Sequence, residues 1–172
     1  MKSIILTTGY FLFFFHVSQS QPGFNNIYNL ELPINHLKEM IVHNDTIIGY
    51  GLAKTADVLN WQQGLLLVKF DSSGNLLQHK LLLDPLGDHY TNGTFWGDII
   101  TTEDGGYALT AAAFYRESAF FIKLGNNLEV EFIKEFNDTF NLNNYNYKLF
   151  ETIDGYLLYG SIQRPNYLNN AF

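Results

Sequence analysis

Three segments of the chain share one pattern, in which two apolar stretches flank a short turn. The pattern occurs at 41–49 (IVHNDTIIG), at 100–109 (ITTEDGGYAL) and at 150–158 (FETIDGYLL). Asn-Asp, Asp-Gly-Gly and Asp-Gly are turn sequences that can adopt positive φ angles, and the β-branched and aromatic residues around them favour strands. Each segment is therefore predicted to form a β-hairpin.

A second hairpin pattern follows each of the first two segments. It reads LVKFDSSGNL at 67–76 and FIKLGNNL at 121–128, again with Gly and Asn in the turn. The second hairpin is predicted to be shorter, because Gly125-Asn126-Asn127 stands in place of Asp71-Ser72-Ser73-Gly74-Asn75. Two hairpins give four strands per unit, and units that recur about every 50 to 60 residues have the size of a β-propeller blade.

The predicted fold class is all-β, as a partial β-propeller of four-stranded antiparallel repeats. The first blade is expected at 36–84, the second at 96–138 and the start of a third at 147–172. Residues 27–32 read like a fourth strand that would close the last blade of the ring. Because a propeller needs about four to eight blades, we expect the chain to be the N-terminal part of a longer protein. The alternative is a complete small β-sandwich of similar strand content.

The first 20 residues have the three-part layout of a secretory signal peptide. Lys2 provides a positive charge, residues 4–17 form an apolar run, and Ser18 and Ser20 place small residues two apart. The apolar run is shorter than the roughly 20 residues of a membrane span. We therefore expect 1–20 to be removed, and the domain at 21–172 to be secreted or held at the cell surface.

The composition favours a folded chain that is stabilised by packing alone. Hydrophobic residues make up 47% of the chain and aromatic residues 16%, and there is no Cys to form disulfides. The net charge of −7 disfavours nucleic acid and anionic membranes as partners, because both would be repelled. No stretch after the signal peptide is long and apolar enough to span a membrane.

The turn and strand motifs resemble those of a known group of proteins. Asp-Gly-Gly-Tyr-x-Leu at 104–109 and Lys-Phe-Asp-Ser-Ser-Gly-Asn at 69–75 are similar to the repeats of secreted propeller-like proteins common in Bacteroidota. Many of those proteins carry a C-terminal sorting domain for type IX secretion. The resemblance extends over roughly 36–172, and it implies a propeller fold and export but no catalytic residues. It is carried by structural motifs, and no sorting domain is present in this sequence.

The sequence contains none of the common catalytic or metal-binding motifs. The histidines never approach a metal-ligand spacing, and no Cys is present to help them. No nucleophile elbow, phosphate-binding loop or dinucleotide fingerprint occurs. We therefore expect no metal and no cofactor, and a non-enzymatic role is the better interpretation. An enzyme remains an alternative, with Asp84, Asp88 and Asp98 as its only local cluster of carboxylates.

Loop lengths give the strongest indication of where a ligand would bind. The turns within each hairpin are predicted to be tight, whereas the connections at the opposite edge of the sheets are long. Binding residues concentrate on loops that a rigid scaffold holds in place. Each aromatic ring could instead fill space between blades. The candidate ligand-binding residues on the long loops are Trp61, Asp88, His89, Tyr90, Trp96, Tyr115, Arg116 and Tyr145.

Three functions remain open on the sequence alone. The favoured one is an exported, non-enzymatic binding or cell-surface module whose ligand is a glycan, a peptide or a surface protein. The second is part of a propeller-fold glycan hydrolase or lyase, which would need two suitably spaced carboxylates. The third is a structural scaffold module of a longer surface protein. Long loops rich in aromatic residues favour binding over a scaffold.

Overall fold

The structure is a computed structural model, and it describes residues 27–33, 35–57, 59–91, 97–115, 118–137, 143–163 and 170–171. Over these residues the fold is all-β, as the sequence predicts, and it contains no helix. The strands are β1 (Asn35–His43), β2 (Thr46–Lys54), β3 (Gln63–Asp71), β4 (Leu76–Leu82), β5 (Tyr90–Thr91), β6 (Ile99–Thr101), β7 (Tyr107–Ala113), β8 (Ala119–Leu124), β9 (Val130–Phe136), β10 (Asn143–Thr152), β11 (Gly155–Gln163) and β12 (Asn170–Ala171).

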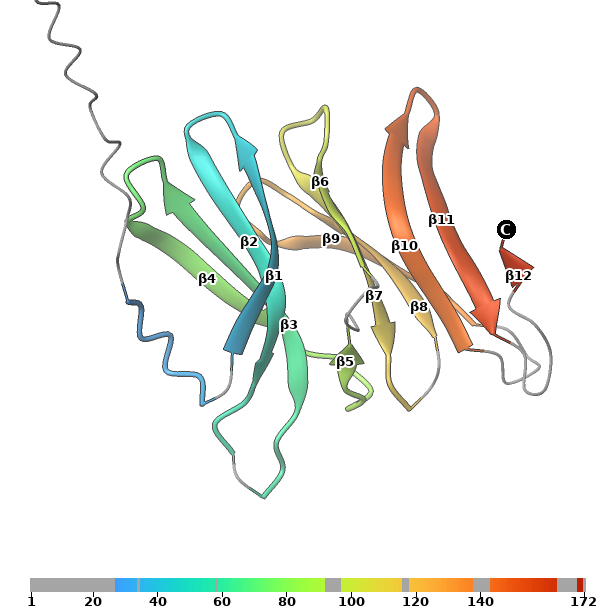
Figure 1. The fold of residues 1–172 in the computed structure, drawn as a ribbon, viewed down its shortest axis with the longest axis horizontal. Coiled ribbons are helices and arrows are strands. Elements are labelled where there is room, and N and C mark those ends of the chain that lie inside the picture. Colours follow the sequence, from blue (N-terminus) through green and yellow to red (C-terminus); the bar gives the residue numbers. More distant parts are fainter. Residues whose placement is uncertain are drawn as a thin grey trace, which may run out of the picture.

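The strands form three antiparallel sheets that follow one another along the chain (Figure 1). Sheet 1 has the order β1-β2-β3-β4. Sheet 2 has the order β5-β7-β8-β9, and β6 also pairs with β7. Sheet 3 has the order β10-β11-β12. The strands of the three sheets span 35–82, 90–136 and 143–171, close to the three units expected from the sequence.

Corresponding hairpins of the sheets share the same irregularities of register. The pairing of β1 with β2 shifts between Leu37 and Glu39, and that of β10 with β11 shifts between Asn146 and Lys148. The first residue pair after the shift in sheet 1 is Glu39 with Tyr50. Lys148 lies opposite Tyr159 at the same place in sheet 3. The first hairpins of sheets 1 and 3 are therefore built alike.

The second hairpins of sheets 1 and 2 have turns of equal length, so the predicted shorter turn is wrong. Phe70 pairs with Leu76 across one turn, and Leu124 pairs with Val130 across the other. Gly74 has a φ of 81° in the first turn, and Leu128 takes the same place with a φ of 61°. A non-glycine residue is strained in this region. Leu128 is nevertheless held there, because its side chain is fully buried in the core.

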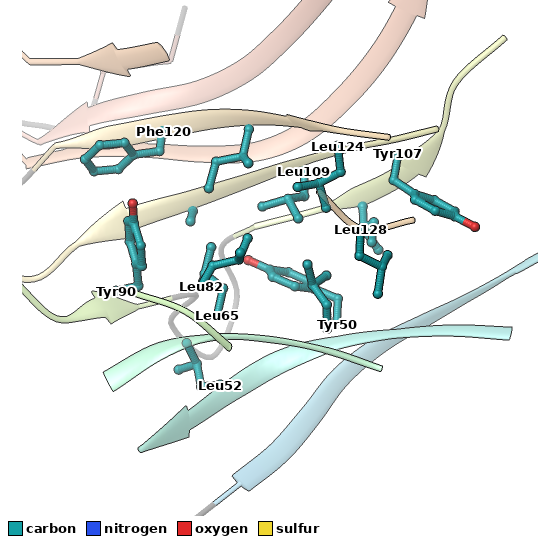
Figure 2. Packing of buried hydrophobic residues seen from close by; sticks show 14 of the residues in the cluster. Tyr50, Leu52, Leu65, Leu82, Tyr90, Tyr107, Leu109, Phe120, Leu124 and Leu128 are labelled. Carbon is teal, nitrogen blue, oxygen red and sulfur yellow. The ribbon is translucent and has the colours of Figure 1, made fainter. Parts of the chain in front are cut away.

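The main core lies between sheets 1 and 2, where side chains of β2 and β3 meet those of β7 and β8 (Figure 2). Tyr50 is fully buried there, and its hydroxyl donates a hydrogen bond to the Thr110 carbonyl oxygen at 2.7 Å. Burial raises the pKa of the Tyr50 phenol, so this donor keeps its proton. A smaller cluster, which includes Ala108, Phe121 and Leu149, joins sheets 2 and 3.

We predict that Tyr50→Phe lowers the free energy of unfolding by about 1 kcal/mol. The substitution keeps the buried ring but removes the donor, which leaves the Thr110 carbonyl without this partner. Urea denaturation measures the effect. Tyr115→Phe is the matched control, because this ring is exposed and the change should cost less than about 0.5 kcal/mol. Equal stability of the two variants would contradict the contact between the sheets.

Residues 27–32, expected to be a closing strand, pair with no described strand. The side chains of Tyr28, Leu30 and Leu32 lie against the face of sheet 1 that points away from sheet 2, whereas Ile27 is exposed. Leu30 is buried in a cluster with Leu66 and Val68, and the Tyr28 hydroxyl donates a hydrogen bond to the Gly74 carbonyl oxygen. The signal peptide predicted at 1–20 lies outside the described residues. Within the described part of the chain, no helix has the length and apolarity to cross a membrane.

The tight turns and the predicted long loops lie at opposite edges of the sheets. In Figure 1 the turns of β1–β2, β6–β7 and β10–β11 lie along the upper edge, and the β2–β3 and β7–β8 loops lie along the lower edge. The positive φ angles predicted for the tight turns occur at Asn44, Gly105 and Gly155. The β2–β3 connection at 55–62 is longer than the turns at 44–45 and 153–154, as predicted, whereas the β7–β8 connection at 114–118 is no longer than the β6–β7 turn at 102–106. The predicted loop asymmetry therefore holds only in part among the described residues.

Candidate functional site

Four aromatic side chains from the long loops form one group at the lower edge. The Trp61 ring stacks on the His89 imidazole, with centroids 4.4 Å apart and planes 10° apart. The centroid of the Tyr115 ring lies 5.5 Å from that of His89, and the two ring planes are tilted to each other. Phe114 packs edge to face on Tyr115, with ring centroids 5.1 Å apart. The Lys54 ammonium lies 3.8 Å from the Trp61 ring centroid. We call these five residues the aromatic cluster.

The aromatic cluster is open to solvent to an extent that is unusual for large apolar rings. Trp61 is 42% exposed, Phe114 62% and Tyr115 69%. The indole of Trp61 has an imidazole and an ammonium against it, so it is better covered than the two rings of the β7–β8 loop. Exposing neighbouring aromatic rings to water is unfavourable in free energy, and such patches commonly mark binding surfaces.

Asp88 holds together the backbones of the two loops that carry His89 and Tyr115. Its Oδ1 accepts hydrogen bonds from the backbone N–H of His89 at 2.6 Å and of Tyr115 at 3.2 Å. The backbone N–H of Phe114 donates to the His89 carbonyl oxygen at 2.9 Å. Asp88 is only 6% exposed. A buried carboxylate that accepts these bonds ties the β4–β5 loop to the β7–β8 loop.

Two glutamines tie the β2–β3 loop into the same site. The Gln62 side-chain amide donates hydrogen bonds to the carbonyl oxygens of Asp84 and Asp88, each at 3.0 Å. The backbone N–H of Gln63 donates to Nδ1 of His89 at 3.0 Å. Because Nδ1 accepts this hydrogen bond, the ring N–H lies on Nε2. Nε2 has no hydrogen-bond partner among the described residues.

The structure brings together four of the eight residues proposed from the sequence: Trp61, Asp88, His89 and Tyr115. Tyr90 does not belong to the site, because it is 1% exposed and packs edge to face on Phe120 at 5.4 Å. Figure 2 shows its ring pointing into the core. The remaining three are Trp96 and Arg116, which lie outside the described residues, and Tyr145, which lies in β10 of sheet 3 opposite Ser161.

Four residues of the site were not predicted from the sequence: Lys54, Phe114, Gln62 and Gln63. Phe114 precedes Tyr115 in the same loop, and this adjacency of two aromatic residues could have revealed it. Lys54 is the last residue of β2, so its approach to Trp61 depends on how the β2–β3 loop folds back. Gln62 and Gln63 donate hydrogen bonds to residues of the β4–β5 loop, and no local sequence pattern predicts such contacts.

The three carboxylates considered for catalysis are used to hold backbone and side chains in place. Asp84 Oδ1 accepts a hydrogen bond from the Leu86 N–H at 2.7 Å, and Asp88 is bound as described above. Asp98 forms an ion pair with Lys148 at 3.0 Å and accepts the Leu149 N–H at 2.9 Å, which links sheet 2 to sheet 3. All three are buried. The hydrogen bond to Asp98 raises the pKa of Lys148.

Among the described residues, no group of His, Asp and Glu side chains comes together as metal ligands. Comparisons of the chain with protein-family models, with curated proteins and with solved structures find no match.

Proposed function

We propose that the chain is part of a β-propeller that serves as an exported, non-enzymatic binding module, and that its ligand binds at the aromatic cluster. One observation carries the binding role: the exposed rings of Phe114 and Tyr115 lie on a loop whose backbone the buried Asp88 carboxylate ties to the loop of His89. A loop that is held in place before binding loses little conformational entropy when a ligand binds, which favours affinity. Export is supported by the signal-peptide layout of residues 1–20.

The surface of sheet 3 supports the propeller arrangement. Ile41 pairs with Ile48 in sheet 1, and Ile48 is fully buried against sheet 2. At the same positions of sheet 3, Phe150 pairs with Leu157, and both side chains are more than half exposed. Sheet 3 thus presents to solvent the apolar face that sheet 1 buries against its neighbour. A further sheet packed there would continue the series, as in a propeller.

The two alternative functions receive less support. A glycan hydrolase or lyase needs two carboxylates that face a substrate, and the described Asp84, Asp88 and Asp98 are buried and bonded within the protein. A scaffold module would have no reason to keep Phe114 and Tyr115 exposed beside each other. We therefore favour ligand binding.

A binding screen with matched variants tests the proposal. We expect the full chain to bind a member of an array of glycans and peptides, and Phe114→Ala/Tyr115→Ala to weaken that binding at least about 100-fold, or about 2.7 kcal/mol. The rings are exposed, so the free energy of unfolding should change by no more than about 0.5 kcal/mol per substitution. Surface plasmon resonance measures the affinity, and urea denaturation measures the stability.

Phe150→Ala/Leu157→Ala is the control, because it removes two exposed apolar side chains from sheet 3, away from the aromatic cluster. This variant should bind the ligand like the parent. If the Phe114→Ala/Tyr115→Ala variant also bound like the parent, the ligand site would lie elsewhere and the proposal would be wrong.

A further inference from the structure

The polar groups that the aromatic cluster leaves open are hydrogen-bond donors. Lys54 contacts the Trp61 ring, and its ammonium has no carboxylate partner among the described residues. His89 has its proton on Nε2, because Nδ1 accepts the Gln63 N–H, and this second donor is also unpartnered within the described part of the chain. A ligand that pairs with both groups must supply acceptors, and one of them should carry negative charge.

The carboxylates in the same loops do not neutralise Lys54. Asp88 is buried and accepts the N–H groups of His89 and Tyr115. Asp57, in the β2–β3 loop, accepts the backbone N–H groups of Leu59 and Asn60 at 2.9 and 3.1 Å. The hydrogen bond from the Asn60 N–H is the largest influence that lowers the pKa of Asp57. Both carboxylates thus bind backbone N–H groups, and among the described residues neither forms an ion pair with Lys54.

The exposed rings define the other half of the ligand. Phe114 and Tyr115 offer apolar faces in an edge-to-face pair, and Tyr115 adds a hydroxyl. The C–H face of a pyranose packs on such a ring, while its hydroxyl groups reach polar groups at the rim. A peptide backbone would bring N–H donors that need acceptors, and the cluster has few open acceptors to satisfy them.

From these features we infer that the aromatic cluster binds an acidic carbohydrate, a pyranose with a carboxylate group. The inference rests on the proposed function and names the ligand class of the same site. In an oligosaccharide of such sugars, one ring packs on Tyr115 and Phe114, a ring or hydroxyl oxygen accepts the His89 Nε2–H, and a carboxylate of the same chain pairs with the Lys54 ammonium beside Trp61. The net charge of −7 opposes an anionic ligand only weakly, because salt screens charges beyond about 8 Å at physiological ionic strength.

The test compares an acidic oligosaccharide with its uncharged methyl ester. Isothermal titration calorimetry of the full chain with an oligomer of galacturonic acid should show at least tenfold tighter binding than with its methyl ester. The difference should shrink as salt is raised, because an exposed ion pair is screened. Lys54→Met keeps the apolar stem over Trp61 but removes the charge. This variant should bind the acid no better than the ester.

Lys80→Met is the matched control for charge. Lys80 already has a partner, Glu129 at 2.6 Å, and it lies in β4, outside the aromatic cluster. The preference of this variant for the acid should therefore equal that of the parent. The inference is overturned if acid and ester bind equally well, or if Lys54→Met keeps the parent's preference for the acid.

Failure of the ligand class can be separated from failure of the binding site. If neither oligosaccharide binds, but a different ligand from the array is lost in Phe114→Ala/Tyr115→Ala, the acidic carbohydrate is wrong and the binding module stands. If that variant retains the array ligand, the binding module itself is wrong.

Discussion

Replacing Leu128 with Ala should lower the free energy of unfolding by about 2 to 5 kcal/mol. The Leu128 side chain is fully buried in the core between sheets 1 and 2, so truncation removes apolar contacts and leaves a cavity. The backbone strain at its φ of 61° remains, since Ala also has a Cβ.

Replacing Leu128 with Gly should be less damaging than replacing it with Ala, by about 1 kcal/mol, because Gly adopts this φ without strain. Leu124→Ala and Leu124→Gly form the matched pair, because Leu124 is equally buried but lies in the strand β8. In a strand, Gly should be the worse substitution. Urea denaturation of the four variants measures the differences. If the Ala and Gly variants ranked in the same order of stability at both positions, the backbone strain at Leu128 would be contradicted.

Tyr90→Ala should cost about 3 to 5 kcal/mol of unfolding free energy, as large aromatic truncations in a core do. The ring is 1% exposed and contacts Phe120 edge to face. Tyr115→Ala, one of the other tyrosines proposed as a ligand contact, should cost less than about 0.5 kcal/mol because its ring is exposed. Thermal and urea denaturation compare the two variants. A loss of stability as small as that of Tyr115→Ala would contradict the burial of the Tyr90 ring.

The tight turns were predictable because local sequence determines them. Asn-Asp and Asp-Gly favour the positive φ that the structure has at Asn44 and Gly155, and strand-forming residues flank both. The long loops were predictable for the same reason, since they are what remains between the hairpins. The placement of turns and loops at opposite edges of the sheets, and the four residues of the site that lie together, follow from this pattern.

Contacts between distant segments were not predictable. Tyr90 was assigned to a loop because only two residues there form a strand, β5, and pairing with β7 is what buries the ring. Leu128 breaks the glycine pattern of its turn because burial in the core outweighs backbone strain. The Lys54–Trp61 contact requires the whole β2–β3 loop to fold back. Each case is decided by tertiary packing, which overrides the local preference.

An NMR titration tests the binding site most directly. The full chain, labelled with nitrogen-15 and carbon-13, is titrated with the compound that binds most tightly on the array. We predict that the largest chemical-shift changes occur at the indole N–H of Trp61, the ring of His89 and the side chain of Tyr115. Changes concentrated at the tight turns 44–45, 102–106 and 153–154, with the aromatic cluster unaffected, would contradict a ligand site on the long loops.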